Sequence, residues 1–133
     1  AQVLLEPGAE LVYAWPSFSM YPHLAAMTGA TAVEVPLTSD HRHDLPAMLA
    51  AITPKTKMVL ICNPNNPTGT FVSHEEIKDF ARQVPSNVCI VIDEAYIEFA
   101  EGIERDALLS LVIERDNVEL MDSLSSCGIG IFL

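Results

Sequence analysis

Short apolar segments alternate with segments of helical periodicity along the chain, and this alternation limits the fold more than any other feature. Five segments rich in β-branched and apolar residues predict strands, at residues 10–15, 31–37, 57–62, 87–93 and 117–122. The third and fourth are apolar on both faces, which is typical of strands inside a parallel sheet. The segments between the strands predict helices, at residues 19–29, 44–52, 73–84 and 105–115.

The helix predicted at residues 73–84 has the clearest boundary signals. Ser73 stands three residues before Glu76, the spacing of a capping box, and Pro85 follows the helix. Strand, helix and strand in repeated succession predict an α/β fold of three layers, with a mainly parallel sheet between two layers of helices. One such domain accounts for residues 1–133.

The charge balance and the cysteines limit the partners and the location. The chain has 7 Lys and Arg against 18 Asp and Glu, a formal net charge of -11, so nucleic acids and anionic membrane surfaces would be repelled. No apolar run approaches the ~18 residues of a membrane span, and no signal-peptide pattern is present. Cys62, Cys89 and Cys127 have no metal-ligand spacing and suit buried free thiols. We therefore expect a cytoplasmic protein that binds neither nucleic acid nor a membrane.

Polar residues follow several predicted strands, at the edge where a parallel sheet binds ligands. The segment NPNNPTG, residues 63–69, directly follows the third strand. Because a residue before proline is kept extended, the amide of Asn66 would be held in place to hydrogen-bond a ring oxygen of a ligand. The alternative is a rigid turn that only ends the strand.

Asp93 ends the fourth strand, which is otherwise apolar. An unpaired carboxylate there would be costly, so it needs a donor or a cation, and a protonated ring nitrogen of a ligand would serve. Tyr96, three residues later, could place its hydroxyl on the same ligand. A cap on a following turn is the alternative role for Asp93.

His41 and His43 flank Arg42 in a predicted loop. The two imidazoles could face one side of the loop, but no third ligand stands at the spacing of a metal site. We interpret both as solvated loop residues and predict no metal site.

Three ordered motifs together resemble one enzyme family. YAWPSFSMYP at residues 13–22, NPNNPTG at 63–69 and DEAYIEF at 93–99 are similar to the large domain of fold-type I pyridoxal-phosphate aminotransferases, most of all the histidinol-phosphate aminotransferases. The resemblance implies pyridoxal 5'-phosphate as cofactor, histidinol phosphate or a similar amino donor, 2-oxoglutarate as the 2-oxo acid, a role in histidine biosynthesis and a homodimer. It also implies the strand order 2-1-3-4-5, with a switch point between the first and third strands.

The resemblance assigns roles to individual residues. Phe18 matches the aromatic residue that stacks on the pyridine ring, whereas Trp15 and Tyr21 are interpreted as wall or core. Asn66 and Tyr96 match the residues that hydrogen-bond the 3-hydroxyl oxygen of the ring. Asp93 matches the carboxylate that keeps the ring nitrogen protonated.

The match continues to Ser125 and then breaks. Ser123 and Ser125 lie in the run that precedes the family's lysine, and Ser125 matches a ligand of the cofactor phosphate. The lysine that would bind the cofactor covalently is replaced by Ser126. The N-terminal segment, the lysine-bearing continuation and the small C-terminal domain of the family have no counterpart, so we expect an inactive partial domain that binds the cofactor weakly or not at all.

Two alternatives to this hypothesis stay open. The first is another enzyme of the same fold type, either an aromatic aminotransferase or a decarboxylase of phosphate-bearing substrates. The second is a degenerate relative that serves as a binding or oligomerising module. The same motifs would appear in all of these proteins.

Overall fold

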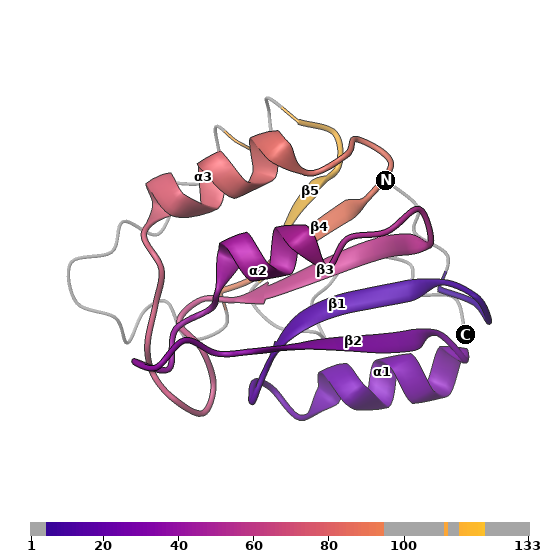
Figure 1. The fold of residues 1–133 in the computed structure, drawn as a ribbon, viewed down its shortest axis with the longest axis horizontal. Coiled ribbons are helices and arrows are strands. Elements are labelled where there is room, and N and C mark those ends of the chain that lie inside the picture. Colours follow the sequence, from indigo (N-terminus) through magenta and orange to yellow (C-terminus); the bar gives the residue numbers. More distant parts are fainter. Residues whose placement is uncertain (1–4, 95–110, 112–114, 122–133) are drawn as a thin grey trace.

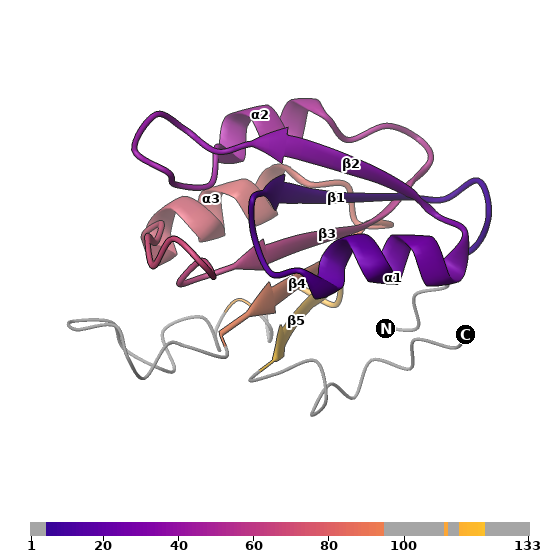
Figure 2. The same cartoon turned by 90° about the horizontal axis from the view of Figure 1, so that it is seen from below.

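The computed structural model describes residues 5–94, 111 and 115–121, which form one sheet with helices on both faces (Figures 1 and 2). The strands are β1 (Glu10–Trp15), β2 (Thr31–Pro36), β3 (Thr56–Cys62), β4 (Cys89–Asp93) and β5 (Val118–Met121). They lie in the order β2-β1-β3-β4-β5, and every neighbouring pair is parallel. The predicted fold class and strand order are confirmed.

The helices are α1 (Met20–Thr28), α2 (Leu45–Ala50) and α3 (His74–Gln83). Figure 1 shows α2 and α3 on one side of the sheet and α1 on the other. The helix predicted at residues 105–115 falls largely outside the described residues. Among the helices described, none is long and apolar enough to cross a membrane.

The central strands bury side chains on both faces of the sheet. In β3, Val59 and Ile61 pack with α2 and α3, whereas Leu60 and Cys62 pack with α1. Because side chains alternate along a strand, Asp93 shares the α1 face with Val91, two residues before it. The end of β4 therefore presents a carboxylate on the α1 side.

The switch point lies between β1 and β3. The chain leaves β1 toward α1 on one face and leaves β3 toward α3 on the opposite face. Such a divergence opens a crevice beyond the carboxyl ends of the two strands, where ligands bind in this class of fold. The loops at residues 16–19 and 63–73 follow the carboxyl ends of these two strands.

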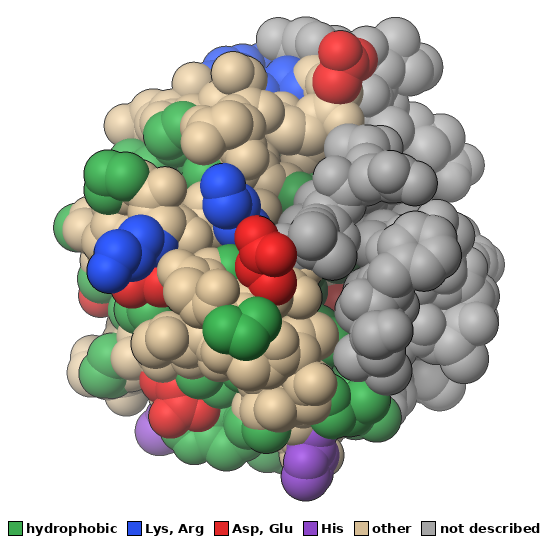
Figure 3. All heavy atoms as spheres, turned by 90° about the vertical axis from the view of Figure 1, so that its right-hand side faces the viewer, with side chains coloured by type: hydrophobic (Ala, Val, Ile, Leu, Met, Phe, Trp, Pro, Cys, Tyr) green, Lys and Arg blue, Asp and Glu red, His purple; other side chains and the backbone are tan. Residues whose placement is uncertain are grey.

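On the face in Figure 3, Lys and Arg side chains of the described residues lie scattered among acidic and hydrophobic ones. They form no continuous basic surface on the described part of this face. This distribution agrees with the acid-rich composition of the chain.

The capping box predicted for α3 is present. Ser73 Oγ accepts from the Glu76 N–H at 3.1 Å, and Glu76 Oε2 accepts from the Ser73 N–H at 2.7 Å. The pair satisfies two backbone donors that the helix leaves without an internal acceptor. Ile77, Phe80 and Ala81 then form the buried face of the helix.

Replacing Ser73 with Ala removes the acceptor for the Glu76 N–H. We expect the free energy of unfolding in urea to fall by about 1 kcal/mol. Ser86→Ala, in the exposed turn after α3, is the control and should leave this free energy unchanged within error. An equal loss in the two variants would contradict the capping role.

Candidate functional site

Asp93 is a buried carboxylate at the carboxyl end of β4, with 4% of its surface exposed. The hydroxyl of Tyr21, which comes from α1, donates to Asp93 Oδ2 at 2.9 Å. Burial, with the nearby Cys62 and Asp93, raises the pKa of Tyr21 well above its usual range, so the hydroxyl keeps its proton. A carboxylate oriented in this way can neutralise a cationic group of a ligand.

Phe18 lies in the loop between β1 and α1 and is half-buried. Its ring stands nearly perpendicular to that of Tyr21, at an interplanar angle of 89° and a centroid distance of 5.7 Å. Phe18 and Asp93 therefore contact the same tyrosine. Tyr21 itself lies in the core, as predicted, but its hydrogen bond to Asp93 was not predicted because it spans 72 residues of sequence.

Asn66 is half-exposed in the loop after β3. Its backbone N–H and the Tyr21 hydroxyl both lie close to the Cys62 thiol, which donates to the Pro64 carbonyl at 3.5 Å and whose pKa is raised chiefly by burial. The structure thus brings Phe18, Asn66 and Asp93 to one corner, around Tyr21 and Cys62. Their contacts with a cofactor stay a prediction.

Four of the residues singled out by the resemblance lie outside the described residues, namely Tyr96, Ser123, Ser125 and Ser126. Cys127 also falls there. Cys62 and Cys89 are buried thiols, as predicted.

Two asparagines that were not singled out as functional are buried and shape the loop after β3. Asn63 pairs with the backbone of Val72, donating through Nδ2 to the carbonyl at 3.0 Å and accepting from the N–H at 2.9 Å. Asn65 contacts the loop after β1, donating to the Pro16 carbonyl at 3.1 Å and accepting from Ser17 Oγ at 2.6 Å. The density of Asn and Pro in this segment was the available signal, but it did not distinguish these roles from that of Asn66.

The interpretation of His43 as a solvated residue is wrong. His43 is 6% exposed, and its Nε2 accepts from the backbone N–H of Cys62 at 3.2 Å. The loop folds inward because the Thr38 N–H donates to the Arg42 carbonyl at 2.8 Å and the Arg42 side chain donates to the Phe71 carbonyl at 3.0 Å. Burial lowers the pKa of His43 to about 4. His41 is exposed, as predicted.

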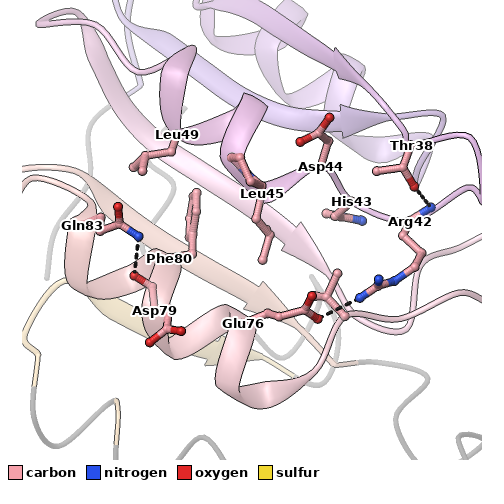
Figure 4. A pocket seen from close by; sticks show the side chains of 12 residues that line it. Thr38, Arg42, His43, Asp44, Leu45, Leu49, Glu76, Asp79, Phe80 and Gln83 are labelled. Atoms are coloured by element: carbon pink, nitrogen blue, oxygen red, sulfur yellow. Dashed lines mark hydrogen bonds and ion pairs between the residues drawn. The ribbon is translucent and has the colours of Figure 1, made fainter.

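Within the described ranges, no group of three or more His, Cys, Asp or Glu side chains could hold a metal ion. A separate hollow of about 480 Å³ lies between α2 and α3, on the sheet face opposite to Asp93. Figure 4 shows Leu45, Leu49 and Phe80 around this hollow, with the Arg42–Glu76 ion pair, 2.7 Å long, at one end. The hollow is not part of the candidate site.

Comparison with known proteins identifies one family. Residues 1–126 match the family described as aminotransferase class I and II. The aromatic amino acid aminotransferase of Streptomyces avermitilis is 46% identical over 129 residues, which cover 94% of this chain and 36% of that protein. The protein of the same name from Thermobifida fusca is 47% identical over 120 residues, covering 90% of this chain and 33% of that protein. The chain thus spans about a third of the length of these curated relatives.

Solved structures show the same fold. Histidinol-phosphate aminotransferase from Sinorhizobium meliloti, in complex with pyridoxal-5'-phosphate, matches with a TM-score of 0.76 and 34% identity, covering 86% of this chain and 31% of that chain. The described residues therefore have the fold of the large domain of fold-type I aminotransferases.

Replacing Tyr21 with Phe removes a donor to a buried carboxylate. We expect the free energy of unfolding to fall by about 2 kcal/mol, because hydrogen bonds to charged groups are the stronger class. Tyr13→Phe is a matched control, since the Tyr13 ring is equally buried but its hydroxyl donates to Glu34, which is exposed. Urea denaturation at neutral pH should show the smaller loss for Tyr13→Phe, and the reverse order would contradict this account of Asp93.

His43 makes the stability of the fold depend on pH. Its pKa is about 4 in the folded chain against an ordinary value of 6.5, so the unfolded chain takes up the proton first. Stability is complete above the unfolded pKa and is lost as the pH falls toward the folded pKa. Between about pH 7.5 and about pH 5, we expect this residue to lower the free energy of unfolding by roughly 2 kcal/mol.

His43→Gln should abolish this part of the pH dependence, because an amide oxygen can still accept from the Cys62 N–H but does not titrate. Urea denaturation at the two pH values measures the difference. His23→Gln, on the exposed side of α1, is the control and should retain the wild-type pH dependence. If His43→Gln had the same pH dependence of stability as the wild type, the pKa of His43 would not differ between the folded and the unfolded chain.

Proposed function

Because the chain belongs to the class I and II aminotransferase family, we propose that it forms part of the cofactor-binding domain of a pyridoxal-phosphate aminotransferase. The observation that carries the proposal is the hydrogen bond from Tyr21 to the buried Asp93, together with the contact between the Tyr21 and Phe18 rings. A carboxylate and an aromatic face at one corner suit a planar, cationic ring. The solved relative from Sinorhizobium meliloti contains such a ring, in pyridoxal-5'-phosphate.

The donor set at this corner fits the chemistry of the cofactor. We assign Asp93 to the ring nitrogen, where a buried carboxylate favours the protonated form. Asn66 would hydrogen-bond the 3-oxygen of the ring, and Phe18 would stack on the ring face. When bound, the cofactor supplies an electron sink for the carbanion that an amino donor forms on losing its α-proton. Tyr21 keeps the Asp93 carboxylate in its orientation throughout.

The remaining assignments rest on the resemblance alone. We propose that Tyr96 donates to the same ring oxygen as Asn66, and that Ser123 and Ser125 contribute to the phosphate site. A homodimer is also a proposal from the resemblance, whereas a cytoplasmic location is proposed from the cysteines and the apolar pattern of the sequence. The acceptor would be a 2-oxo acid such as 2-oxoglutarate.

For the amino donor we propose a compound with a planar ring on its side chain. The curated relatives at 46% and 47% identity are named for aromatic amino acids. The solved relative at 34% identity is named for histidinol phosphate, which has an imidazole ring. The higher identities favour an aromatic amino acid, with histidinol phosphate as the second candidate.

The lysines of this chain bear on the covalent step. Lys55 and Lys57 lie at the amino end of β3, at the edge of the sheet opposite to Asp93. Lys78, on α3, pairs with Glu75 at 3.6 Å on the far face of the sheet. We therefore propose that residues 1–133 hold the cofactor weakly and without a covalent bond.

The cofactor site can be tested with 4'-deoxypyridoxine 5'-phosphate, a ring compound that lacks the aldehyde and cannot react with any lysine. Trp15, the one tryptophan in the sequence, lies beside the site and reports binding through its fluorescence. We expect measurable binding, and an affinity at least about tenfold weaker for Asp93→Asn, because a charged hydrogen bond to the ring nitrogen is lost. Asp79→Asn, an exposed position on α3, should bind as the wild type does.

Absence of binding to the wild-type chain, or equal affinities for the two variants, would overturn the assignment of Asp93. A second measurement concerns the covalent step. Borohydride reduction with pyridoxal phosphate, followed by mass spectrometry, should yield no stoichiometric adduct on any one lysine. Such an adduct, together with amino transfer from phenylalanine or histidinol phosphate, would contradict the proposal that the cofactor is held without a covalent bond, with Ser126 in the place of the lysine.

A further inference from the structure

Asn65 joins two loops at the carboxyl edge of the sheet through its side chain. It is 3% exposed, and its Nδ2 donates to the Pro16 carbonyl at 3.1 Å and to Thr68 Oγ1 at 2.8 Å. Its Oδ1 accepts from Ser17 Oγ at 2.6 Å. Both donors of the amide are thus used, and its oxygen is paired with a hydroxyl.

The backbone of Asn65 closes its own loop independently of the side chain. The Asn65 N–H donates to the Thr70 carbonyl at 2.8 Å, and the Gly69 N–H donates to the Asn65 carbonyl at 2.7 Å. The turn after β3 is therefore held by main-chain bonds. The side-chain bonds to Pro16 and Ser17 have a different effect, because they join this loop to the loop after β1.

The same network reaches the loop after β2. Thr68 and Thr70 are joined through their hydroxyls at 2.8 Å, and Thr70 donates to the His41 carbonyl. Three loops that follow neighbouring strands are thus connected through the segment that begins at Asn65. The Ser17–Asn65 bond of this network is buried, whereas the Thr70–His41 bond is exposed. Connected hydrogen bonds with a buried member fix geometry more strongly than separate bonds do.

We infer that Asn65 is a positioning residue, which fixes the spacing between the Phe18 ring and the Asn66 amide. The side-chain bonds of Asn65 to Pro16 and Ser17 are called the clamp below. Phe18 directly follows Ser17, and Asn66 directly follows Asn65, so the clamp connects the neighbours of the two proposed ligand residues. Asn65 is itself buried and acts through these neighbours. The inference rests on the proposed function for its consequence in binding, although the clamp is a property of the chain alone.

An aspartate at this position could not make the same contacts. Asn65→Asp keeps the shape and the acceptor for Ser17, but it loses both donors and faces the Pro16 carbonyl with a negative charge. Ser17→Ala is a milder change, which removes one bond between the loops and leaves the turn after β3 intact. Asn87→Asp, in an exposed turn, introduces the same charge elsewhere and serves as the control.

The first experiment measures amide hydrogen exchange by NMR without any ligand. The Tyr21 N–H donates to the Phe18 carbonyl at 3.1 Å, and in Asn65→Asp and Ser17→Ala we expect its exchange to accelerate at least about tenfold, since the bonds that hold this loop are lost. Val12 and Leu60, in the strands, should keep their protection. In Ser17→Ala, Gly69 should exchange as in the wild type. Unchanged exchange of the Tyr21 amide in both variants would overturn the clamp.

The second experiment titrates the same chains with 4'-deoxypyridoxine 5'-phosphate. We expect affinity to fall at least about tenfold in Asn65→Asp and less in Ser17→Ala. At saturation, the absorption maximum of the bound ring should move toward that of the free ring in Asn65→Asp, because stacking and the hydrogen bond to the 3-oxygen are misaligned. Asn87→Asp should match the wild type in both properties.

The outcomes separate the clamp from the cofactor proposal. Wild-type affinity and an unmoved absorption maximum in Asn65→Asp, with accelerated exchange of the Tyr21 amide, would overturn the positioning role while leaving the cofactor site standing. Failure of the wild-type chain to bind the ring would overturn the proposed function and with it the role of Asn65 in binding. The exchange data would still decide whether the clamp exists. If Asn65→Asp does not fold, Ser17→Ala alone decides the test. The inference then requires that Ser17→Ala show both the faster exchange and the weaker affinity.

Discussion

The central strands β1, β3 and β4 are apolar on both faces, and the arrangement of every polar group in the candidate site depends on this. Helices must cover both faces, so the chain leaves β1 and β3 in opposite directions, and the ends of these two strands are where ligands bind in this class of fold. Polar side chains then have one place in the layer structure, the ends of the strands. Asp93, Asn63 and the loop around Asn65 all lie at such ends.

A carboxylate at this depth is costly unless donors face it, and Tyr21 meets part of that requirement from α1. The same tyrosine contacts Phe18 and the Cys62 thiol, so one buried ring relates the end of β4 to the loops after β1 and β3. The site is therefore built into the core rather than placed on the surface. Its geometry and the stability of the domain depend on the same contacts.

The two sides of the sheet serve different purposes. On the α1 side, buried polar groups are linked by short hydrogen bonds across loops. On the α2 and α3 side, the hollow beside Phe80 is lined by apolar and polar side chains together and has at one end an exposed ion pair, which contributes little to stability. His43 lines this hollow, and its imidazole accepts from the end of β3 and stays neutral because it is buried.

The sequence by itself determined the strands, the capping box of α3 and, through its resemblance to one family, the strand order and the identity of Phe18, Asn66 and Asp93 as candidates. Periodicity and capping are local properties, so a short window of residues contains them. Only the tertiary structure decided that Tyr21 donates to Asp93, that Asn65 joins two loops and that His43 is buried. The two residues in these contacts are separated in the sequence by 72, 48 and 19 positions, respectively. The contacts exist because neighbouring parallel strands bring their carboxyl ends together.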